Sequence, residues 1–502
     1  MLRKIRITLA ALFFLGLTLL FLDFTGTAHT WLGWMAKVQF LPAVMALNVV
    51  VIVVLIALTL VFGRIYCSVI CPLGVLQDIF GLLGKKAHKN RYTYSPEVRW
   101  LRYTMLVIMV VAMLAGIGSL VQLLAPYSAF GRIATMLLQP LWQMGNNLLA
   151  SWAERADSYT FYSVDVWLRS MPVLIIALVT FVALVVLAWR GGRTYCNTIC
   201  PVGTLLSFFA RFSWLKINFD KDKCKNCSLC TKNCKASCID FKNHTVDYSR
   251  CVVCGDCIDV CKFGALSLTP GPSPKERGVN TSSSDNSDEK GNAGSASRRS
   301  FLLATAMATT AALAQEKKKV DGGLAELQDK AMPERLTPVV PPGALSLKNM
   351  ATRCTGCQLC VSQCPNGVLR PSTDLMHLMQ PVMSFERGYC RPECTRCSDV
   401  CPAGAIQPLD EVLKSSIQIG HAVVVVDQCL SAKGEAECGN CARHCPAGAI
   451  EMVSSDPDDD LSPLVPAVNE TRCIGCGACE YLCPVRPLSA IHVEGHEVHK
   501  TI

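Results

Sequence analysis

Residues 63–74 read GRIYCSVICPLG, and residues 192–203, which begin 129 positions later, read GRTYCNTICPVG. Each copy follows an apolar stretch, places two cysteines four residues apart, and continues with a proline suited to the first turn of a new helix. Such a duplication predicts a helical bundle of two similar halves related by a pseudo-twofold axis. The axis would bring together four thiols, those of Cys67, Cys71, Cys196 and Cys200.

Four thiolates at one point suit a tetrahedral metal ion or an iron–sulfur cluster. The alternative is that the two motifs only pack the repeat and that their thiols stay reduced and inert. We predict shared ligation, because four soft ligands at a symmetric point are hard to explain by packing alone.

The sequence around the motifs is apolar enough for a membrane protein, with a mean hydropathy of +0.32 and only 17% charged residues. Crossing about 30 Å of hydrocarbon takes about 20 helical residues, and only helices satisfy every backbone group there. The stretches that are long enough, or nearly so, are 7–24, 41–63, 103–125 and 171–189. Residues 1–217 are therefore predicted to form a membrane α-helical bundle of four spans.

The orientation of the spans follows from their flanking Lys and Arg residues. Three basic residues precede the first span, and seven lie in the loop after the second, namely Arg64, Lys85, Lys86, Lys89, Arg91, Arg99 and Arg102. Both ends of the bundle are therefore expected on the cytoplasmic side. The first span could instead be a cleaved signal peptide, but residues 25–30 make a poor cleavage site.

The segment 218–268 carries two cysteine runs of ferredoxin type. A [4Fe–4S] cluster takes four thiolates, and in two-cluster ferredoxins the fourth cysteine of each run ligates the other cluster. The first expected ligand set is Cys224, Cys227, Cys230 and Cys261, and the second is Cys251, Cys254, Cys257 and Cys234. Cys238 is left over, and we interpret it as a buried spectator rather than as a replacement for Cys234.

Four more runs, each ending in Cys-Pro, follow from about residue 340 to the end of the chain. They are Cys354, Cys357, Cys360 and Cys364; Cys390, Cys394, Cys397 and Cys401; Cys429, Cys438, Cys441 and Cys445; and Cys473, Cys476, Cys479 and Cys483. With these, all 29 cysteines are accounted for. The spacing predicts six [4Fe–4S] clusters in total but does not decide whether the last four runs pair with neighbours or nest. Structural zinc would not require this repetition.

A second targeting signal lies between the two iron–sulfur regions. Residues 269–297 are rich in Pro, Ser, Gly and Asn and are read as a flexible linker. In 298–320, Arg298-Arg299 precede a 14-residue apolar run, which is the pattern of a Tat signal or anchor. A chance arginine pair before a small buried helix is the alternative. Residues 321–502 would then form an exported four-cluster polyferredoxin domain, with or without cleavage near residue 314.

Other functions lack their motifs. The chain has no C-x-x-C-H, G-x-G-x-x-G or Walker sequence, so covalent haem and nucleotide sites have no support. The net charge of +9 comes without a basic–aromatic tract, and no nucleic-acid partner is expected.

These motifs together identify a resemblance. The first 270 residues or so resemble the NapH-type quinol dehydrogenase membrane subunit. The segment from Arg298 onward resembles NapG of the MauM/NapG type, a Tat-exported polyferredoxin. The resemblance implies an inner-membrane protein with a cytoplasmic two-cluster ferredoxin and a periplasmic four-cluster domain. It also implies electron transfer from membrane quinol to a periplasmic cytochrome or reductase, with a nitrate reductase-like system as one example.

The ligands of the quinol are not identified by the sequence. Asp23, His29, Gln139, Gln143 and Glu154 near the outer face are interpreted as interfacial anchors or helix caps, as are Tyr66 and Tyr195 beside the cysteines.

Two competing functions stay open. The paired C-x3-C-P motifs also resemble the CcoG/RdxA proteins, in which case the four bundle cysteines would handle copper during assembly of a respiratory enzyme. The exported clusters favour a conduit, because a metal reductase working inside needs none. A subunit of an ion-pumping complex is disfavoured by the few ionisable residues in the spans.

Overall fold

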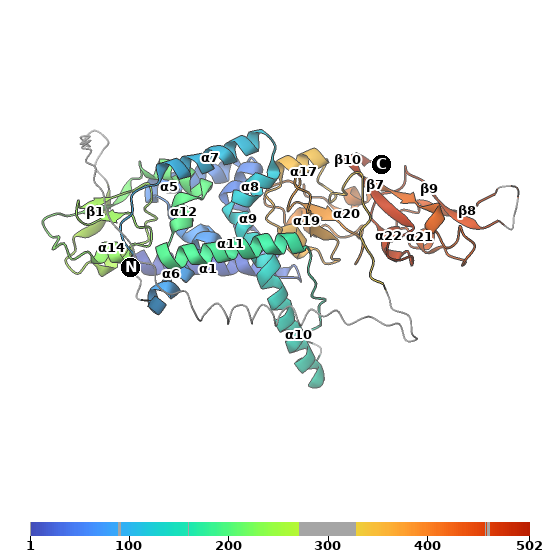
Figure 1. Cartoon of the computed structure of the whole chain (residues 1–502), viewed down its shortest axis with the longest axis horizontal. Coiled ribbons are helices and arrows are strands. Elements are labelled where there is room, and N and C mark those ends of the chain that lie inside the picture. Colours follow the sequence, from blue (N-terminus) through green and yellow to red (C-terminus); the bar gives the residue numbers. More distant parts are fainter. Residues whose placement is uncertain (1, 89–91, 159, 271–327, 457, 459–461) are drawn as a thin grey trace, which may run out of the picture.

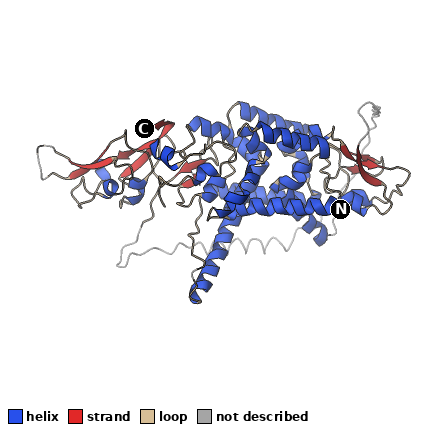
Figure 2. Ribbon diagram, turned by 180° about the vertical axis from the view of Figure 1, so that it is seen from behind, coloured by secondary structure: helices blue, strands red, loops and turns tan. Residues whose placement is uncertain are grey.

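The computed structural model describes residues 2–88, 92–158, 160–270, 328–456, 458 and 462–502. Three parts follow one another along its long axis (Figure 1). A bundle of helices lies in the middle, a small region containing strand β1 (Leu215–Phe219) lies at one end, and the C-terminal region lies at the other. The strands are confined to the two ends (Figure 2).

The first half of the bundle contains three longer helices, three short ones and one π-helical turn. Its elements are α1 (Leu2–Leu22), α2 (Thr27–Leu32), α3 (Trp34–Lys37), α4 (Phe40–Met45), α5 (Val49–Phe62), the π-turn η1 (Tyr66–Ile70) and α6 (Pro72–His88).

The second half ends with the same arrangement of a helix, a short turn and a further helix. Its elements are α7 (Arg99–Leu114), α8 (Gly118–Leu124), α9 (Pro126–Ile133), the π-turn η2 (Ala134–Leu138), α10 (Gln139–Arg155), α11 (Met171–Gly191), α12 (Thr194–Thr198) and α13 (Pro201–Ala210). The prolines of the repeated motif begin α6 and α13, as the sequence predicted.

The four predicted spans are formed unequally. Among the described residues, two helices, at Arg3–Leu22 and Met171–Gly191, are long and apolar enough to cross a membrane. The continuous helices expected over 41–63 and 103–125 are not formed, because α4 is followed by α5, and α7 by α8, after short breaks. Asn48 starts α5 anew by accepting from Val51 N, and Gly116 interrupts the second stretch with φ of +73°.

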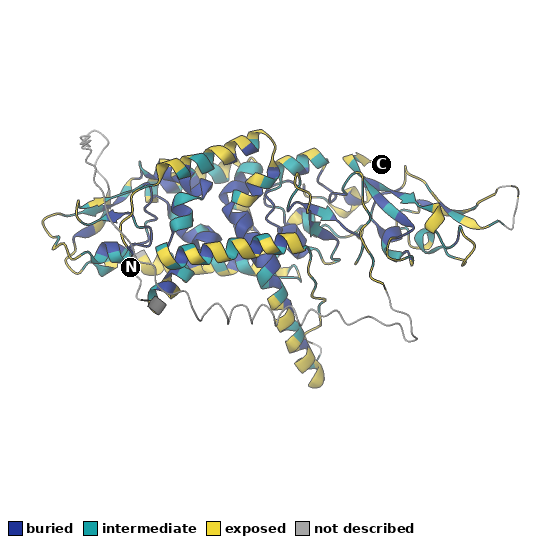
Figure 3. Cartoon of the chain, in the orientation of Figure 1, coloured by how far each residue is buried: buried dark blue, intermediate teal, exposed yellow. Residues whose placement is uncertain are grey.

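The outward sides of the bundle are exposed (Figure 3), and many of their exposed residues are apolar. In the most apolar stretch of 18 residues, only 22% of α11 and 28% of α1 is buried. A core helix of a soluble protein is mostly buried. Exposed apolar residues follow α7 and α11, for example Val107, Leu114, Ile175 and Val179. An apolar surface of this extent is typical of a face that contacts lipid or another protein.

The smaller end region has ferredoxin-like α+β structure. β1 pairs antiparallel with β4 (Leu266–Pro270), and β2 (Ile239–Asp240) pairs with β3 (Thr245–Val246). The short helices α14 (Leu229–Asn233) and α15 (Asp256–Val260) each follow the first cysteines of a run.

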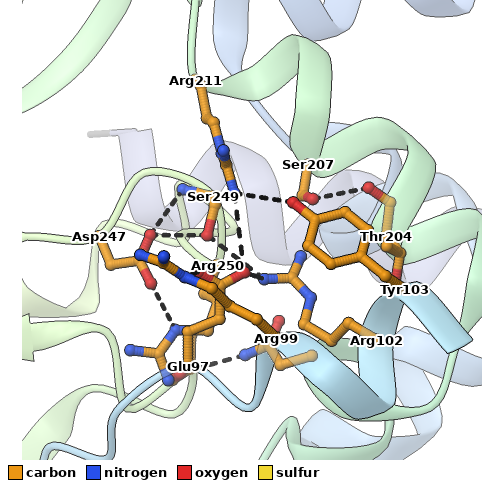
Figure 4. Close-up of polar contacts among 12 residues, drawn as sticks. Glu97, Arg99, Arg102, Tyr103, Thr204, Ser207, Arg211, Asp247, Ser249 and Arg250 are labelled. Atoms are coloured by element: carbon orange, nitrogen blue, oxygen red, sulfur yellow. Dashed lines mark hydrogen bonds and ion pairs between the residues drawn. The ribbon is translucent and has the colours of Figure 1, made fainter.

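A polar network fastens this region to the bundle (Figure 4). The fully buried guanidinium of Arg102 pairs with Glu97 and donates to Ser249 Oγ over 3.3 Å. Asp247 in turn accepts from Ser249 and from Arg250, both at 2.6 Å.

Asp78 in α6 forms a second connection. Its carboxylate receives two hydrogen bonds from Arg193, at 2.7 and 2.8 Å, and one from Lys235 at 2.6 Å. Arg6 of α1 approaches to 3.3 Å. Burial alone would raise the pKa of Asp78, but the charges of Arg193 and Lys235 hold that pKa well below its usual range. One buried carboxylate thus joins α1, α6, the second motif and the ferredoxin region.

The C-terminal region is built from three two-stranded antiparallel sheets and short helices. β5 (Leu369–Pro371) pairs with β6 (Pro381–Met383), β7 (Ile417–Val424) with β10 (Ile491–Thr501), and β8 (Ile450–Ser454) with β9 (Leu464–Val468). The helices are α17 (Leu347–Arg353), α18 (Leu359–Gln363), α19 (Arg396–Asp399), α20 (Glu411–Ser416), the 3₁₀ turn η4 (Val426–Gln428), α21 (Asn440–Arg443) and α22 (Ala478–Leu482).

This region docks on the opposite end of the bundle from the ferredoxin region (Figure 1). Gln363 donates to the carbonyl oxygens of Leu20 and Asp23 at the end of α1, at 2.7 and 2.6 Å. The ring of Trp167, in the segment before α11, lies 4.6 Å from the Arg370 guanidinium and 5.0 Å from that of Arg387. Cation–π contacts of this kind contribute about 0.5–2 kcal/mol each.

Replacing Asp78 by Asn should destabilise the junction by about 3–5 kcal/mol, because three cations lose their buried counter-charge. The depressed pKa makes the Asp78 contribution complete above the unfolded Asp pKa of about 3.9 and lost as the pH falls through the folded-state pKa. Unfolding in detergent should therefore separate wild type from Asp78→Asn at pH 7, with the gap closing below about pH 4.

The matched control is Asp259→Asn, because the exposed Asp259 pairs with Arg3 over 3.6 Å and surface pairs contribute at most about 1 kcal/mol. Equal stability of the two variants would contradict the role assigned to Asp78.

Candidate functional site: six ferredoxin-type thiol sets and one bundle set

The structure brings the four cysteines of the repeated motif together. All four are buried. Cys67 lies within η1 and Cys71 directly after it, while Cys196 lies within α12 and Cys200 two residues after its end. Burial is the main cause that raises the pKa of Cys71, Cys196 and Cys200, and neighbouring thiolates raise it further. These thiolate interactions join every pair among the four, which we name the bundle set.

Two arginines connect the halves of the bundle set by reciprocal hydrogen bonds. Arg64 of the first motif donates to the carbonyl oxygen of Cys196 over 3.0 Å, and Arg193 of the second donates to that of Cys67 over 2.5 Å. Both guanidinium groups are fully buried. The predicted pseudo-twofold relation is therefore visible in the hydrogen bonds.

Hydrogen-bond donors also point at the sulfurs. Gln77 Nε2 lies 3.3 Å from Cys196 Sγ, and Gly203 N lies 3.4 Å from Cys200 Sγ. Arg64 Nη2 lies 3.8 Å from Cys67 Sγ. Donors of this kind stabilise thiolates, so the surroundings fit an anionic group held by four sulfurs.

The buried charge of Arg64 also indicates an anionic group at the bundle set. Its other hydrogen bonds go to Asn197 Oδ1 at 2.8 Å and to the carbonyl oxygen of Ser249 at 3.2 Å. Arg193 has Asp78, but no ion pair joins Arg64 to a carboxylate in the described residues. A buried cation needs a counter-charge, and the thiolates are the anions beside it.

In the described part of the chain, no group of three or more His, Cys, Asp or Glu side chains is arranged to hold one metal ion. A [4Fe–4S] cluster takes four thiolates, and the hypothesis for the bundle set stays a metal ion or such a cluster.

The ferredoxin region gathers its cysteines as the crossed pattern predicts. Set 1, which consists of Cys224, Cys227, Cys230 and Cys261, lines one cavity. In set 2, the charges of Cys251, Cys254 and Cys234 all raise the pKa of Cys257, after burial as the main cause. The sulfur of Cys238 lies only 3.5 Å from that of Cys234, so the spectator is in direct contact with a predicted ligand.

The C-terminal cysteines pair between neighbouring runs, which the sequence had left open. One cavity is lined by set 5, which consists of Cys429, Cys438, Cys441 and Cys483. The next is lined by set 6, which consists of Cys473, Cys476, Cys479 and Cys445. The fourth cysteine of each run therefore belongs to the other run's set.

The first two C-terminal runs follow the same rule. Burial is the main cause that raises the pKa of Cys354, Cys357 and Cys360, and Cys401 raises all three further. We name these four cysteines set 3. Likewise, burial is the main cause that raises the pKa of Cys390 and Cys397, and the charge of Cys364 raises both further. We name Cys364, Cys390, Cys394 and Cys397 set 4.

The seven sets are distributed over the three parts of the molecule: sets 1 and 2 lie in the ferredoxin region, the bundle set in the bundle, and sets 3–6 in the C-terminal region. Set 2 adjoins the bundle set, since Asn197 Nδ2 donates to Ala236 O over 3.1 Å. Set 3 lies near set 4, since the charge of Cys397 is among the causes that raise the pKa of Cys360. Set 4 meets set 6 through the 2.9 Å hydrogen bond from Cys390 N to Cys476 O. Set 5 lies beside α21, β8 and β9, farthest from the bundle (Figure 1).

The polar residues interpreted as anchors or caps have structural partners in part. Asp23 accepts from the backbone of Thr25, Gly26 and Ala28, which makes it a cap. Gln139 donates to Ser362 O over 3.1 Å and therefore holds the C-terminal region. Tyr66 donates to Gln39. Gln77 and the roles of Arg64 and Arg193 were not predicted from the sequence. The two arginines occupy the same place in both copies of the motif, and this repetition indicated that they have a shared role.

Comparisons with known proteins support iron–sulfur chemistry. The family described as "4Fe-4S binding domain" matches residues 44–90 and 173–221, which contain both copies of the bundle motif. Families described as "4Fe-4S dicluster domain" match residues 247–368 and 436–486. Together with the thiol sets, these matches define an electron-transfer protein of ferredoxin type with several [4Fe–4S] domains.

Individual relatives narrow the class. The chain is 34% identical over 167 residues to the methylamine utilization ferredoxin-type protein MauM of Methylobacillus flagellatus, which covers 32% of this chain and 70% of MauM. It is 29% identical over 238 residues to the ferredoxin-type protein NapH of Escherichia coli, covering 46% and 69%. The putative electron transport protein YccM of Escherichia coli is 27% identical over 229 residues, covering 46% and 57%. The chain belongs to the NapH/MauM family of ferredoxin-type proteins, which confirms the predicted resemblance.

Neighbour pairing can be tested by exchanging one cysteine. Cys483→Ser should perturb the cluster of Cys429, Cys438 and Cys441, although Cys483 belongs to the run of Cys473, Cys476 and Cys479. We expect Cys483→Ser and Cys429→Ser to alter the same EPR signal, whereas Cys445→Ser and Cys473→Ser alter another. Cys483→Ser and Cys473→Ser sharing one signal would contradict the pairing.

Proposed function

We propose that this protein is a membrane-bound iron–sulfur electron-transfer protein that passes electrons from the quinol pool to a periplasmic cytochrome or reductase, with a nitrate reductase-like system as one example. The observation that carries the proposal is that thiol sets lie in all three parts of the molecule, namely the ferredoxin region, the bundle and the C-terminal region. A [4Fe–4S] cluster held by four such thiolates carries one electron at a time. The chain would hold six clusters in sets 1–6 and a further metal or iron–sulfur group in the bundle set.

The placement of the two iron–sulfur regions supports a position across the membrane. They dock at opposite ends of the bundle (Figure 1), and α1 reaches from one to the other. Arg3 at its start pairs with Asp256 over 2.9 Å, and Leu20 near its end accepts from Gln363. A helix of 21 residues is about 31 Å long, which matches a hydrocarbon layer of about 30 Å.

The four apolar stretches would all lie within this layer, the second and third as broken helices. Their breaks are acceptable at membrane depth where neighbouring helices or side chains satisfy the freed backbone groups. The long exposed apolar faces of α7 and α11 would then contact lipid. The positive-inside rule would then put the ferredoxin end of the bundle in the cytoplasm, and the C-terminal region, which docks at the opposite end, would lie in the periplasm.

The helix α10 fits the outer boundary of this layer. It projects sideways from the bundle, across the direction of α11 (Figure 1), and starts beside the docked C-terminal region at Gln139. Its exposed face carries Leu141, Trp142, Leu148, Leu149 and Trp152. Tryptophans are typical of membrane–water interfaces, where amphipathic helices lie in the plane.

Export of the C-terminal region would require the Tat machinery. The segment predicted to carry the signal, 298–320, and nearly all of the predicted linker lie outside the described residues. A reporter fused after Ile502 tests the proposal directly. We expect periplasmic reporter activity in Tat-competent cells and its loss in Tat-deficient cells. Activity confined to the cytoplasm in both strains would overturn the export.

Quinol oxidation is tested on the purified protein. We expect menaquinol or ubiquinol analogues to reduce the clusters rapidly under anaerobic conditions, followed by visible absorbance and EPR. The double variant Cys67→Ser/Cys196→Ser should lose this reduction while retaining the six clusters of sets 1–6, because only the bundle set is changed.

Ser68→Ala is the matched control, since Ser68 lies in the same π-turn and its hydroxyl donates to Ile65 O over 3.1 Å. No reduction by any quinol, with all clusters intact, would overturn the proposed donor and favour a metal-reducing assembly factor.

A further inference from the structure

The phenol of Tyr127 in α9 is buried without a hydrogen-bond partner. Its side chain is 1% exposed, and its hydroxyl oxygen has no donor or acceptor within reach. Leaving a buried hydroxyl unsatisfied costs about 1–3 kcal/mol. Such a group in an otherwise tightly packed helix calls for a partner that the protein atoms alone do not supply.

The surroundings of the hydroxyl identify that partner. Burial is the main cause that raises the pKa of Tyr127, and the thiolates of Cys357 and Cys401 raise it further. Both cysteines belong to set 3, yet Tyr127 belongs to the bundle. Its ring also packs against Phe21 of α1, at a centroid distance of 6.0 Å.

The helix that carries Tyr127 is shaped to approach set 3 closely. Ser128 donates to the carbonyl oxygen of Thr355, and Gln122 of the preceding helix α8 donates to that of Cys354 over 3.2 Å. Gly131 has no side chain where a Cβ would collide with the carbonyl oxygen of Cys357. One turn of α9 thus lies directly on the loop that presents the cysteines.

We propose that the Tyr127 hydroxyl donates a hydrogen bond to the iron–sulfur group held by Cys354, Cys357, Cys360 and Cys401, and that the bundle thereby sets the reduction potential of this set. Tyr127 is a positioning residue, because it acts on the group through a hydrogen bond and holds none of the iron itself. The inference rests on the proposed function only in assigning a cluster to set 3.

The direction of the effect follows from charge. A cluster held by four thiolates is more negative when reduced, and a hydrogen bond to its sulfurs stabilises the more negative state. Docking of the C-terminal region on α9 therefore raises the potential of the set next to the bundle. An undocked domain would hold the same cluster at a lower potential and accept electrons from the bundle less readily.

The test is a redox titration of the full-length protein, monitored by EPR, with the signal of set 3 assigned by the variant Cys401→Ser. Tyr127→Phe removes only the hydroxyl, and we expect it to shift the midpoint potential of this signal to a more negative value. The other signals should stay unchanged. Tyr162→Phe is the matched control, because Tyr162 is exposed and lies in the segment before α11.

A second variant separates the hydroxyl from the docking. Gly131→Ala keeps Tyr127 but forces α9 away from Cys357, so the same signal should shift in the same direction. Unchanged potentials in Tyr127→Phe, with full iron content, would overturn the proposal. The outcome is independent of quinol oxidation: a normal shift without reduction by quinol would leave the inference standing while the proposed donor fails.

Discussion

The rest of the structure depends on one constraint, which is the pair of reciprocal hydrogen bonds that Arg64 and Arg193 each donate to the other motif. Each guanidinium reaches the carbonyl oxygen of the first cysteine in the other motif, so neither half can be placed without the other. Because Arg193 also binds Asp78, the same pair of hydrogen bonds fixes α6, and through Lys235 it fixes the ferredoxin region. A duplicated pair of residues thereby couples the bundle fold to the position of its thiols.

The electrostatics of this centre explain why it should hold an anion. Four cations lie around Asp78 and the bundle set. Arg6, Arg193 and Lys235 share Asp78, and Lys235 also lies 3.6 Å from Asp256, whereas Arg64 forms no ion pair with a carboxylate in the described residues. Buried cations in excess of buried carboxylates are costly. Four thiolates with a bound iron–sulfur group would balance them. The same charges that stabilise the junction would therefore favour the filled over the empty site.

The sequence predicted what depends on local spacing and symmetry. The gathering of Cys67, Cys71, Cys196 and Cys200 followed from one repeat, and the crossed sets of the ferredoxin region followed from the C-x2-C runs. The pairing of the four C-terminal runs did not, because the partner of a fourth cysteine such as Cys364 is decided by how loops pack. The breaks at residues 46–48 and 115–117 were missed because hydropathy records polarity and not backbone continuity. Tyr127 could not be found at all, since its neighbours Cys357 and Cys401 lie more than two hundred residues away.

The chain path itself constrains the topology. The ferredoxin region ends with β4 at one end of the bundle, and the C-terminal region docks at the other. Under the proposed placement in a bilayer, these two regions would lie on opposite sides of it. The predicted twin-arginine signal before the apolar run that follows Arg299 would supply the export that this placement needs. Tyr127 would then meet set 3 only after the polyferredoxin domain had reached the far side.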